Sequence, residues 1–126
     1  MGVVSVSRVL LRFRIANRGE AEVEVLRHLA PATVGLLIRA LPVQARISRQ
    51  TSGVVAILST LEAGPEKLRG EFARGDIALY PASGHLWIFL RPQVVPRPMN
   101  PLGRVTTGIE LLESCAARDV VTITAA

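Results

Sequence analysis

Two neighbouring segments near the start of the chain alternate between apolar and polar residues. Residues 8–16 read RVLLRFRIA and residues 20–26 read EAEVEVL, with the short stretch Asn17-Arg18-Gly19 between them. A period of two is typical of a strand that buries one face. The sequence therefore predicts a β-hairpin with a three-residue turn at 17–19, where Gly19 can adopt a left-handed conformation.

The same alternation predicts which side chains face each other across the hairpin. Opposite charges meet on one face and apolar residues meet on the other, in the pairs Arg14–Glu22, Arg12–Glu24, Phe13–Val23 and Leu11–Val25. Glutamates at every second position could also form a metal or acid/base site. The facing arginines favour a ladder of solvated ion pairs instead.

The next segment has the pattern of a helix. Pro31 fits the first turn of a helix, and Pro42 ends it. Apolar residues at helical spacing form one stripe, made of Val34, Leu37, Ile38 and Leu41. Because the stripe is one-sided, we expect this helix to cover an opening or flank of a β-structure.

The rest of the chain predicts more strands and a second, short helix. We expect two strands within 43–60 with a turn at 51–53, strands at 77–81 and 85–91, a strand piece at 103–105, a short helix at 109–115 and a closing strand at 120–124. Residues 62–75 read as a polar connection and the proline-rich residues 92–103 as a loop. These elements predict a mainly β fold, a closed eight-stranded antiparallel barrel capped by one longer and one short helix, in a single domain spanning 1–126.

Composition narrows the class of protein. No apolar run approaches the ~18 residues of a membrane-spanning helix. Residues 1–11 lack the pattern of a signal peptide, so we expect a cytoplasmic protein without a membrane partner. Cys115 is the only cysteine, which excludes an internal disulfide or a cysteine-rich metal site. It is interpreted as a small buried apolar residue rather than a nucleophile.

The charge pattern does not favour nucleic acid as a partner. The net charge is +5, but the basic residues are scattered, and no motif combines aromatic and basic residues for stacking bases. Lys67 is the only lysine among the 15 basic residues, and Asn and Gln are scarce. A composition with much Arg and little Lys, Asn and Gln is frequent in heat-stable proteins. A GC-rich genome favours Arg over Lys as well.

Residues 19–41 resemble the opening of cyclophilins, in which a strand leads into an A-P-x-T-V helix. The matching positions are Glu24, Ala30, Pro31, Thr33, Val34 and Leu41. Later segments resemble a small prokaryotic group of cyclophilin-like proteins of unknown function, known from archaea and Thermotoga. The segments that carry this likeness are GDIALYP at 75–81, Ile88-Phe89, 98–101, Gly103-Arg104-Val105 and Glu110-Leu111-Leu112.

The resemblance implies a barrel fold, and for true cyclophilins it implies peptidyl-prolyl cis–trans isomerase activity. That activity depends on the motif F-H-R-x-x-x-x-F-M-x-Q-G-G-D. The corresponding stretch here reads ARISRQTSGVVAIL, in which Arg46 matches the arginine. The Phe-Met pair, the Gln and the Gly-Gly-Asp are missing. Arg46 is therefore a catalytic candidate only if the chain is an isomerase.

A binding surface is predicted on the outside of the barrel. If Leu86, Ile88 and Leu90 point inward, the residues between them point outward, and exposed aromatic residues commonly mark binding sites. Arg97, in the proline-rich segment, joins this set. The candidate ligand-binding residues are Gln44, Arg46, His85, Trp87, Phe89 and Arg97. The alternative is that Trp87 and Phe89 point inward into the core, and that the leucines face outward or into a dimer.

Three hypotheses for function follow from the sequence. The first is a binding module for a peptide or small molecule in a surface groove. The second is a weak or altered peptidyl-prolyl isomerase that uses Arg46. The third is a structural or assembly protein, such as a homo-oligomer that buries Trp87 and Phe89, or else a nucleic-acid binder. No motif indicates a metal or a cofactor, so neither is expected.

Overall fold

The computed structural model describes residues 7–51 and 53–126 of the chain. Its elements in chain order are β1 (Arg8–Ile15), β2 (Gly19–Leu26), α1 (Pro31–Ala40), β3 (Val43–Thr51), β4 (Val54–Ile57), β5 (Arg69–Phe72), β6 (Asp76–Tyr80), β7 (His85–Phe89), β8 (Gln93–Thr107), α2 (Ile109–Ser114) and β9 (Val120–Ala125). Ser52, within the turn predicted at 51–53, lies outside the described residues.

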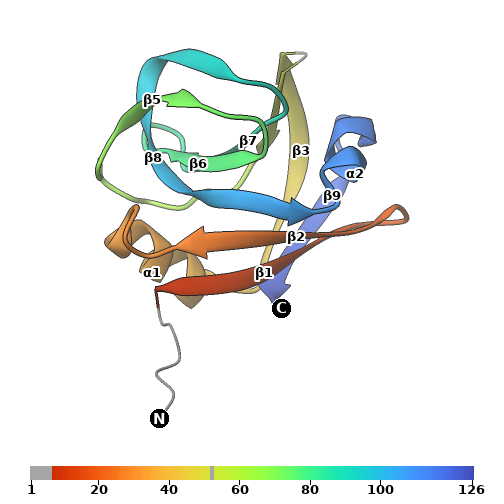
Figure 1. Ribbon diagram of the computed structural model, residues 1–126. Coiled ribbons are helices and arrows are strands. Elements are labelled where there is room, and N and C mark those ends of the chain that lie inside the picture. Colours follow the sequence, from red (N-terminus) through yellow and green to blue (C-terminus); the bar gives the residue numbers. More distant parts are fainter. Residues whose placement is uncertain (1–6, 52) are drawn as a thin grey trace.

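Eight of the strands form a closed antiparallel ring. The order is β2-β1-β9-β3-β4-β7-β6-β8, and pairing of β8 with β2 closes it (Figure 1). The predicted mainly β barrel is therefore confirmed. One further strand, β5, pairs with β8 outside the ring. It lies within residues 62–75, which were predicted to be a polar connection without a strand, so that detail of the prediction was wrong.

The β1–β2 hairpin forms with a different register from the predicted one. Ile15 faces Gly19, Arg14 faces Glu20 and Arg12 faces Glu22, so that the turn spans residues 16–18. Asn17 supplies the left-handed conformation in the turn, with φ 65°, which asparagine tolerates better than most residues. Since the register differs by two residues rather than one, every side chain stays on its predicted face.

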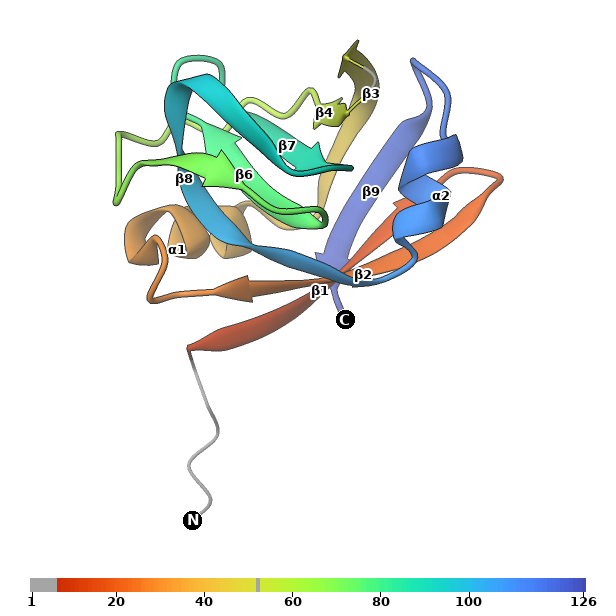
Figure 2. The ribbon, with the colours of Figure 1, turned by 45° about the horizontal axis from the view of Figure 1, so that its top comes forward.

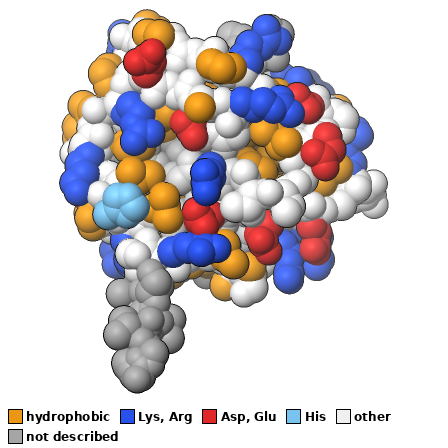
Figure 3. Space-filling model, in the orientation of Figure 1, with side chains coloured by type: hydrophobic (Ala, Val, Ile, Leu, Met, Phe, Trp, Pro, Cys, Tyr) orange, Lys and Arg blue, Asp and Glu red, His pale blue; other side chains and the backbone are white. Residues whose placement is uncertain are grey.

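The predicted ion-pair ladder is exposed only near the turn. Glu20 lies 3.3 Å from Arg12 and 3.4 Å from Arg14, on a surface where both charges are exposed. Figure 3 shows acidic and basic side chains side by side over this hairpin, at the lower right. Glu24 differs from the prediction because it is 7% exposed, and it pairs with Arg8 and Arg104. Arg104 lies on the neighbouring strand β8, directly opposite Glu24.

Helix α1 begins at Pro31 and ends before Pro42, as predicted. Its residues Val34 and Leu37 are fully buried in the main core, while Ile38 and Leu41 pack at the edge of that core. Helix α2 also lies where it was predicted. Cys115 follows it and is 3% exposed, and burial raises the pKa of its thiol. Within the described residues, neither helix has the length and apolar character needed to span a membrane.

The largest correction concerns residues 92–103, which were predicted to be a loop. All of them except Pro92 belong to the long strand β8, which contains Pro96, Pro98 and Pro101. The strand tolerates these prolines because its pairing is irregular, with register shifts against both β5 and β6. Pro96 and Pro98 are also exposed, on the part of β8 that lies outside the ring.

Because β8 extends beyond the ring, the molecule has two apolar clusters. The main cluster fills the barrel and contains Leu86, Ile88 and Leu90, which confirms their inward orientation. The second lies between the barrel wall and the ribbon formed by β5 and the first half of β8 (Figure 2). There Phe72 stacks on Phe89 with a centroid distance of 4.5 Å.

Phe89 thus points out of the barrel, but it is fully buried. The expectation that it faces solvent was wrong because the β5–β8 ribbon covers it. The alternative, that Trp87 and Phe89 point into the barrel, was wrong as well. Trp87 stays partly exposed at the edge of the second cluster.

Candidate functional site

Two of the predicted site residues, Trp87 and Arg97, line the same pocket. The pocket has a volume of about 160 Å³ and lies between the outer face of β6–β7 and the first half of β8. Its other lining residues are Tyr80, Val95, Pro96 and Met99. Alternation along β7 places Trp87 on the outer face, and the outward extension of β8 brings Arg97 over it. The result is a small aromatic pocket with one guanidinium at its rim, and we name it the Trp87 pocket.

Trp87, in the wall of the pocket, packs against two other aromatic side chains. Trp87 meets the edge of Tyr80 at a centroid distance of 5.9 Å and tilts against the buried Phe89 at 6.2 Å. Its indole Nε1 is buried and has no hydrogen-bond partner among the described residues. A buried donor without an acceptor costs about 1–3 kcal/mol. The packing of the ribbon against Trp87 therefore leaves one polar group unsatisfied.

Arg97 carries a charge that no acidic residue within the described part of the chain neutralises. It is exposed, and no described carboxylate lies within 4.0 Å of its guanidinium. A guanidinium presents several N–H donors in a fixed plane, which suits carboxylates and carbonyl oxygens. The Trp87 pocket can therefore hold an apolar ring while Arg97 donates hydrogen bonds to an acceptor beside it.

The structure does not bring Gln44 and Arg46 to this pocket. Arg46 lies on β3, and β4 separates that strand from β7. The Arg46 guanidinium donates to the carbonyl oxygen of Arg118 at 3.3 Å, and Gln44 donates to Thr122 Oγ1 at 3.3 Å. Both side chains are exposed and are directed toward the β9 side of the barrel. His85 is partly buried and pairs with Tyr80 at the start of β7, where the turn 81–84 ends.

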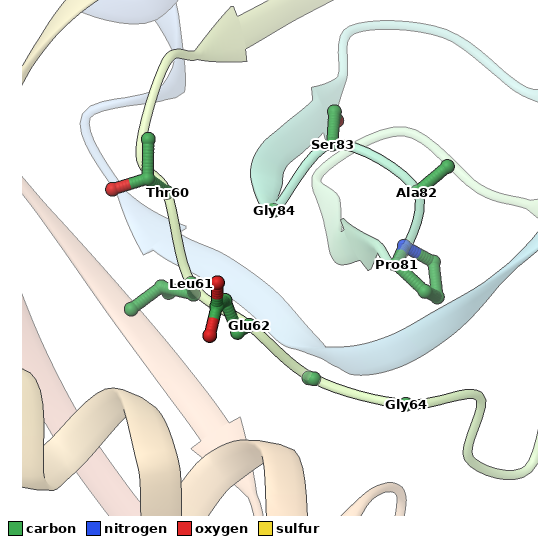
Figure 4. A pocket seen from close by; sticks show the side chains of 9 residues that line it. Thr60, Leu61, Glu62, Gly64, Pro81, Ala82, Ser83 and Gly84 are labelled. Atoms are coloured by element: carbon green, nitrogen blue, oxygen red, sulfur yellow. The ribbon is translucent and has the colours of Figure 1, made fainter.

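Sequence reasoning missed a second hollowed region, on both sides of residues 60–66. This segment runs between α1 and the β6–β7 turn, as Figure 4 shows. One hollow, of about 470 Å³, separates Thr60–Gly64 from Pro81–Gly84. The other, of about 340 Å³, separates the same segment from the exposed side of α1. Glu62, Ala63 and Gly64 border both hollows.

A hydrogen-bond network fixes this segment to the start of α1. The Glu66 carboxylate accepts from the backbone N–H groups of Ala32 and Thr33, each at 2.9 Å, and from Thr33 Oγ1 at 2.8 Å. Burial acts to raise the pKa of Glu66, but these three hydrogen bonds outweigh it and lower the pKa below its ordinary value. The partners lie 33 or 34 residues apart, and no local pattern in the sequence indicates their contact.

No cluster of three or more His, Cys, Asp or Glu side chains suited to a metal ion occurs within residues 7–51 and 53–126. His28 is exposed, and its backbone oxygen accepts a hydrogen bond from Lys67 Nζ at 2.7 Å.

Comparison with solved structures supports the barrel fold. The hypothetical protein AF2241 from Archaeoglobus fulgidus is similar over 100% of both chains, with a TM-score of 0.81 and 23% identity. McbB, whose structure was solved in complex with tryptophan, matches 91% of this chain with a TM-score of 0.73 and 13% identity. This chain spans 44% of the length of McbB. At these identities the likeness shows the fold alone.

No protein-family model matches the chain, and no curated protein does.

Proposed function

We propose that the chain is a cyclophilin-like binding module that holds part of a peptide or small molecule in the Trp87 pocket. The observation that carries this proposal is the meeting of Trp87, Tyr80 and the unpaired Arg97 around one cavity on the outer wall of the barrel. An apolar pocket with few polar groups at its edge is the usual design of a ligand site. The resemblance to cyclophilins supports a site on this outer surface.

The size of the pocket limits what it accepts. At about 160 Å³ it is smaller than the roughly 300–1,000 Å³ of sites that enclose a whole drug-sized ligand. It suits a single ring or side chain, and the rest of the ligand extends along β8 outside it. A hydrogen-bond acceptor of the ligand, next to its bound ring, pairs with Arg97. The similarity to McbB, which was solved with tryptophan, supports a small molecule as one class of ligand.

The test uses Trp87 as its own probe, since it is the only tryptophan of the chain. Titration with Ala-Ala-Pro-Phe peptides and with benzoate should shift the tryptophan emission and show saturation. The Arg97→Gln variant should bind the carboxylate of benzoate more weakly. Arg118→Gln, an exposed arginine elsewhere, is the matched control. Emission that stays constant across both probes would remove the proposal.

A second candidate function is a weak peptidyl-prolyl isomerase. What favours it is a guanidinium next to a pocket of the size of one ring, because a hydrogen bond to the twisted amide lowers the barrier to rotation. A protease-coupled assay on Ala-X-Pro peptides tests it, with the variants Arg97→Ala and Arg46→Ala compared. Loss of acceleration in Arg97→Ala alone would assign the activity to the Trp87 pocket. Loss in Arg46→Ala alone would place the peptide over β3, and no acceleration in the parent protein would end this candidate.

A further inference from the structure

The hollow between α1 and residues 62–66 has the features of a small-molecule site separate from the Trp87 pocket. Its volume is about 340 Å³, and its apolar lining includes Leu36, Ala63 and Pro65. Across Ala63 and Gly64 lies the larger hollow that reaches the β6–β7 turn (Figure 4). The space is therefore large enough for a compact molecule, with room for a longer group to extend over the segment.

Two side chains of opposite charge line this hollow without pairing. Arg39 lies in the last turn of α1 and Glu62 lies on the extended segment, and both are exposed. Their charged atoms are more than 4.0 Å apart, and neither forms an ion pair with any other described residue. Unpaired opposite charges at one hollow suit a ligand that carries both charges and fits between them.

The other carboxylate at the hollow is already in use. Glu66 accepts three hydrogen bonds from Ala32 and Thr33 and serves the start of α1. It adds negative charge to the end of the hollow that lies opposite Arg39 along the helix. Among the acidic residues lining the hollow, Glu62 is therefore the one with its acceptor oxygens available.

Gly35 accounts for the position of the Arg39 side chain. A Cβ atom at residue 35 would lie 3.2 Å from Arg39 Nη1, so that the guanidinium lies back along the helix over the glycine. Glycine weakens the interior of a helix relative to alanine. Here its missing side chain leaves the space that the guanidinium of Arg39 occupies.

From these features we infer that the hollow binds a free α-amino acid with an apolar side chain. Its carboxylate pairs with Arg39, its ammonium group pairs with Glu62, and its side chain lies against Leu36 and Ala63. Both pairings are charge-assisted hydrogen bonds, and an amino acid carries the two charged groups on one carbon atom, its Cα. The expected ligand is therefore a zwitterion, and it should bind more tightly than a simple acid or a simple amine, each of which carries only one of the two charges.

Three related probes test the inference on the full chain. Leucine carries both charges, N-acetyl-leucine keeps only the carboxylate, and leucine methyl ester keeps only the ammonium group. Titration monitored by ¹⁵N NMR should show saturable shifts at the amides of Gly35, Ala63 and Gly64 with leucine, with affinity in the millimolar range. Each of the other two probes should bind roughly three- to tenfold more weakly, as expected for loss of one exposed charge pair.

Matched variants assign the two charges. Arg39→Gln should weaken the binding of leucine several-fold and leave the affinity for the methyl ester unchanged. Glu62→Gln should weaken the binding of leucine and leave the affinity for N-acetyl-leucine unchanged. The controls Arg118→Gln and Glu110→Gln change exposed charges elsewhere and should leave leucine affinity unchanged. The inference is overturned if leucine causes no shifts in the hollow, if the ester binds as tightly as leucine, or if the variants of Arg39 and Glu62 behave like the controls.

Discussion

At the scale of single residues, Asn100 joins three parts of the chain. Its side chain is fully buried on β8. Its Oδ1 accepts from the backbone N–H of Glu66 at 2.8 Å, and its Nδ2 donates to Thr33 Oγ1 at 3.0 Å and to the oxygen of Gly64 at 2.8 Å. The amide thus fixes α1 and residues 64–66 to the barrel, and with them one wall of the proposed amino-acid site.

Replacing this amide should be costly. Asn100→Ala leaves the N–H of Glu66 and the oxygen of Gly64 without partners, and we expect the free energy of unfolding to fall by about 2–4 kcal/mol. Urea denaturation at pH 7 measures the change. The control is Gln44→Ala, which removes one exposed hydrogen bond of 3.3 Å and should change stability by less than about 0.5 kcal/mol. Equal stability of the two variants would contradict the role given to Asn100.

Single residues also show where sequence reasoning stops. Alternation predicted the face of Phe89 and Glu24 correctly, because each side chain follows the pleat of its own strand. It did not predict their burial, because the residues around them lie elsewhere in the chain: the β5–β8 ribbon covers Phe89, and Arg104 of β8 lies beside Glu24. The position of Arg97 beside Trp87 has the same origin, since it depends on the path of β8.

At the scale of elements, α1 depends on a distant residue for its N-terminal cap. Ala30 stands at the cap position and has no side-chain acceptor. In many helices the side chain of the N-cap residue accepts hydrogen bonds from the first free N–H groups. Here the Glu66 carboxylate accepts them instead, from Ala32 and Thr33. Because these hydrogen bonds lower the pKa of Glu66 in the folded protein, the carboxylate stabilises the fold while it is charged.

The sign of the pH dependence follows from this lowered pKa. The contribution of Glu66 is complete above its ordinary pKa of 4.5 and is lost as the pH falls through the lower value of the folded state. We therefore expect Glu66→Gln to be less stable than the parent protein at pH 7, and the difference to shrink below pH 4.5. Urea titrations from pH 7 to pH 3 measure it.

Comparing Glu66→Gln with the parent protein separates the contribution of Glu66 to the pH dependence of stability from that of other acidic groups. The pKa of Asp119 is lowered by hydrogen bonds from the Ala116 N–H and Arg18, and that of Glu113 by its hydrogen bond to Arg74, so both proteins lose stability in acid. Glu71→Gln, which changes an exposed carboxylate on β5, is the control. A difference between Glu66→Gln and the parent that stays the same at pH 3 and pH 7 would refute the assignment.

The β5–β8 ribbon offers a second test at this scale. Phe72 is 4% exposed and stacks on Phe89 at 4.5 Å, so Phe72→Ala should lower stability by about 3–5 kcal/mol. Loss of this contact should also admit water around Trp87 and shift its emission to longer wavelength. Val94→Ala, at a side chain that is 74% exposed on the same ribbon, should change neither quantity. A stable Phe72→Ala protein with unchanged emission would mean that the ribbon does not depend on this stack.

At the scale of the whole molecule, the sequence predicted the barrel but not how it closes. Strands with clear alternation, such as β1 and β2, were predicted with nearly their observed bounds. β5 has four residues, RGEF, and no apolar repeat, so no periodic pattern marks it. β8 contains three prolines, which normally exclude a strand, and its bulges depend on partners far away in the sequence.

Closure of the ring depends on one glycine in β8. Gly103 faces Val25 of β2 and Ile77 of β6, so at this residue β8 pairs with both of its neighbours in the ring. A Cβ atom here would overlap the backbone oxygen of Glu24. Any side chain must therefore move β2 away from β8, at the pair of strands that closes the barrel.

Gly103→Ala should consequently destabilise the protein by more than about 3 kcal/mol. The overlap is with backbone and not with a flexible side chain, so it can be relieved only by breaking backbone hydrogen bonds of the closed ring. Gly70→Ala is the matched control, since a Cβ atom at residue 70 of β5 has no neighbour within 4 Å. Thermal melting gives the stability, and amide hydrogen exchange in β2 and β8 shows where the ring opens. Faster exchange confined to these two strands would locate the defect at the closing pair. A Gly103→Ala protein as stable as the Gly70→Ala protein would show that β2 and β8 can separate without cost. The barrel would then be held together by the other seven pairings and by the core inside it.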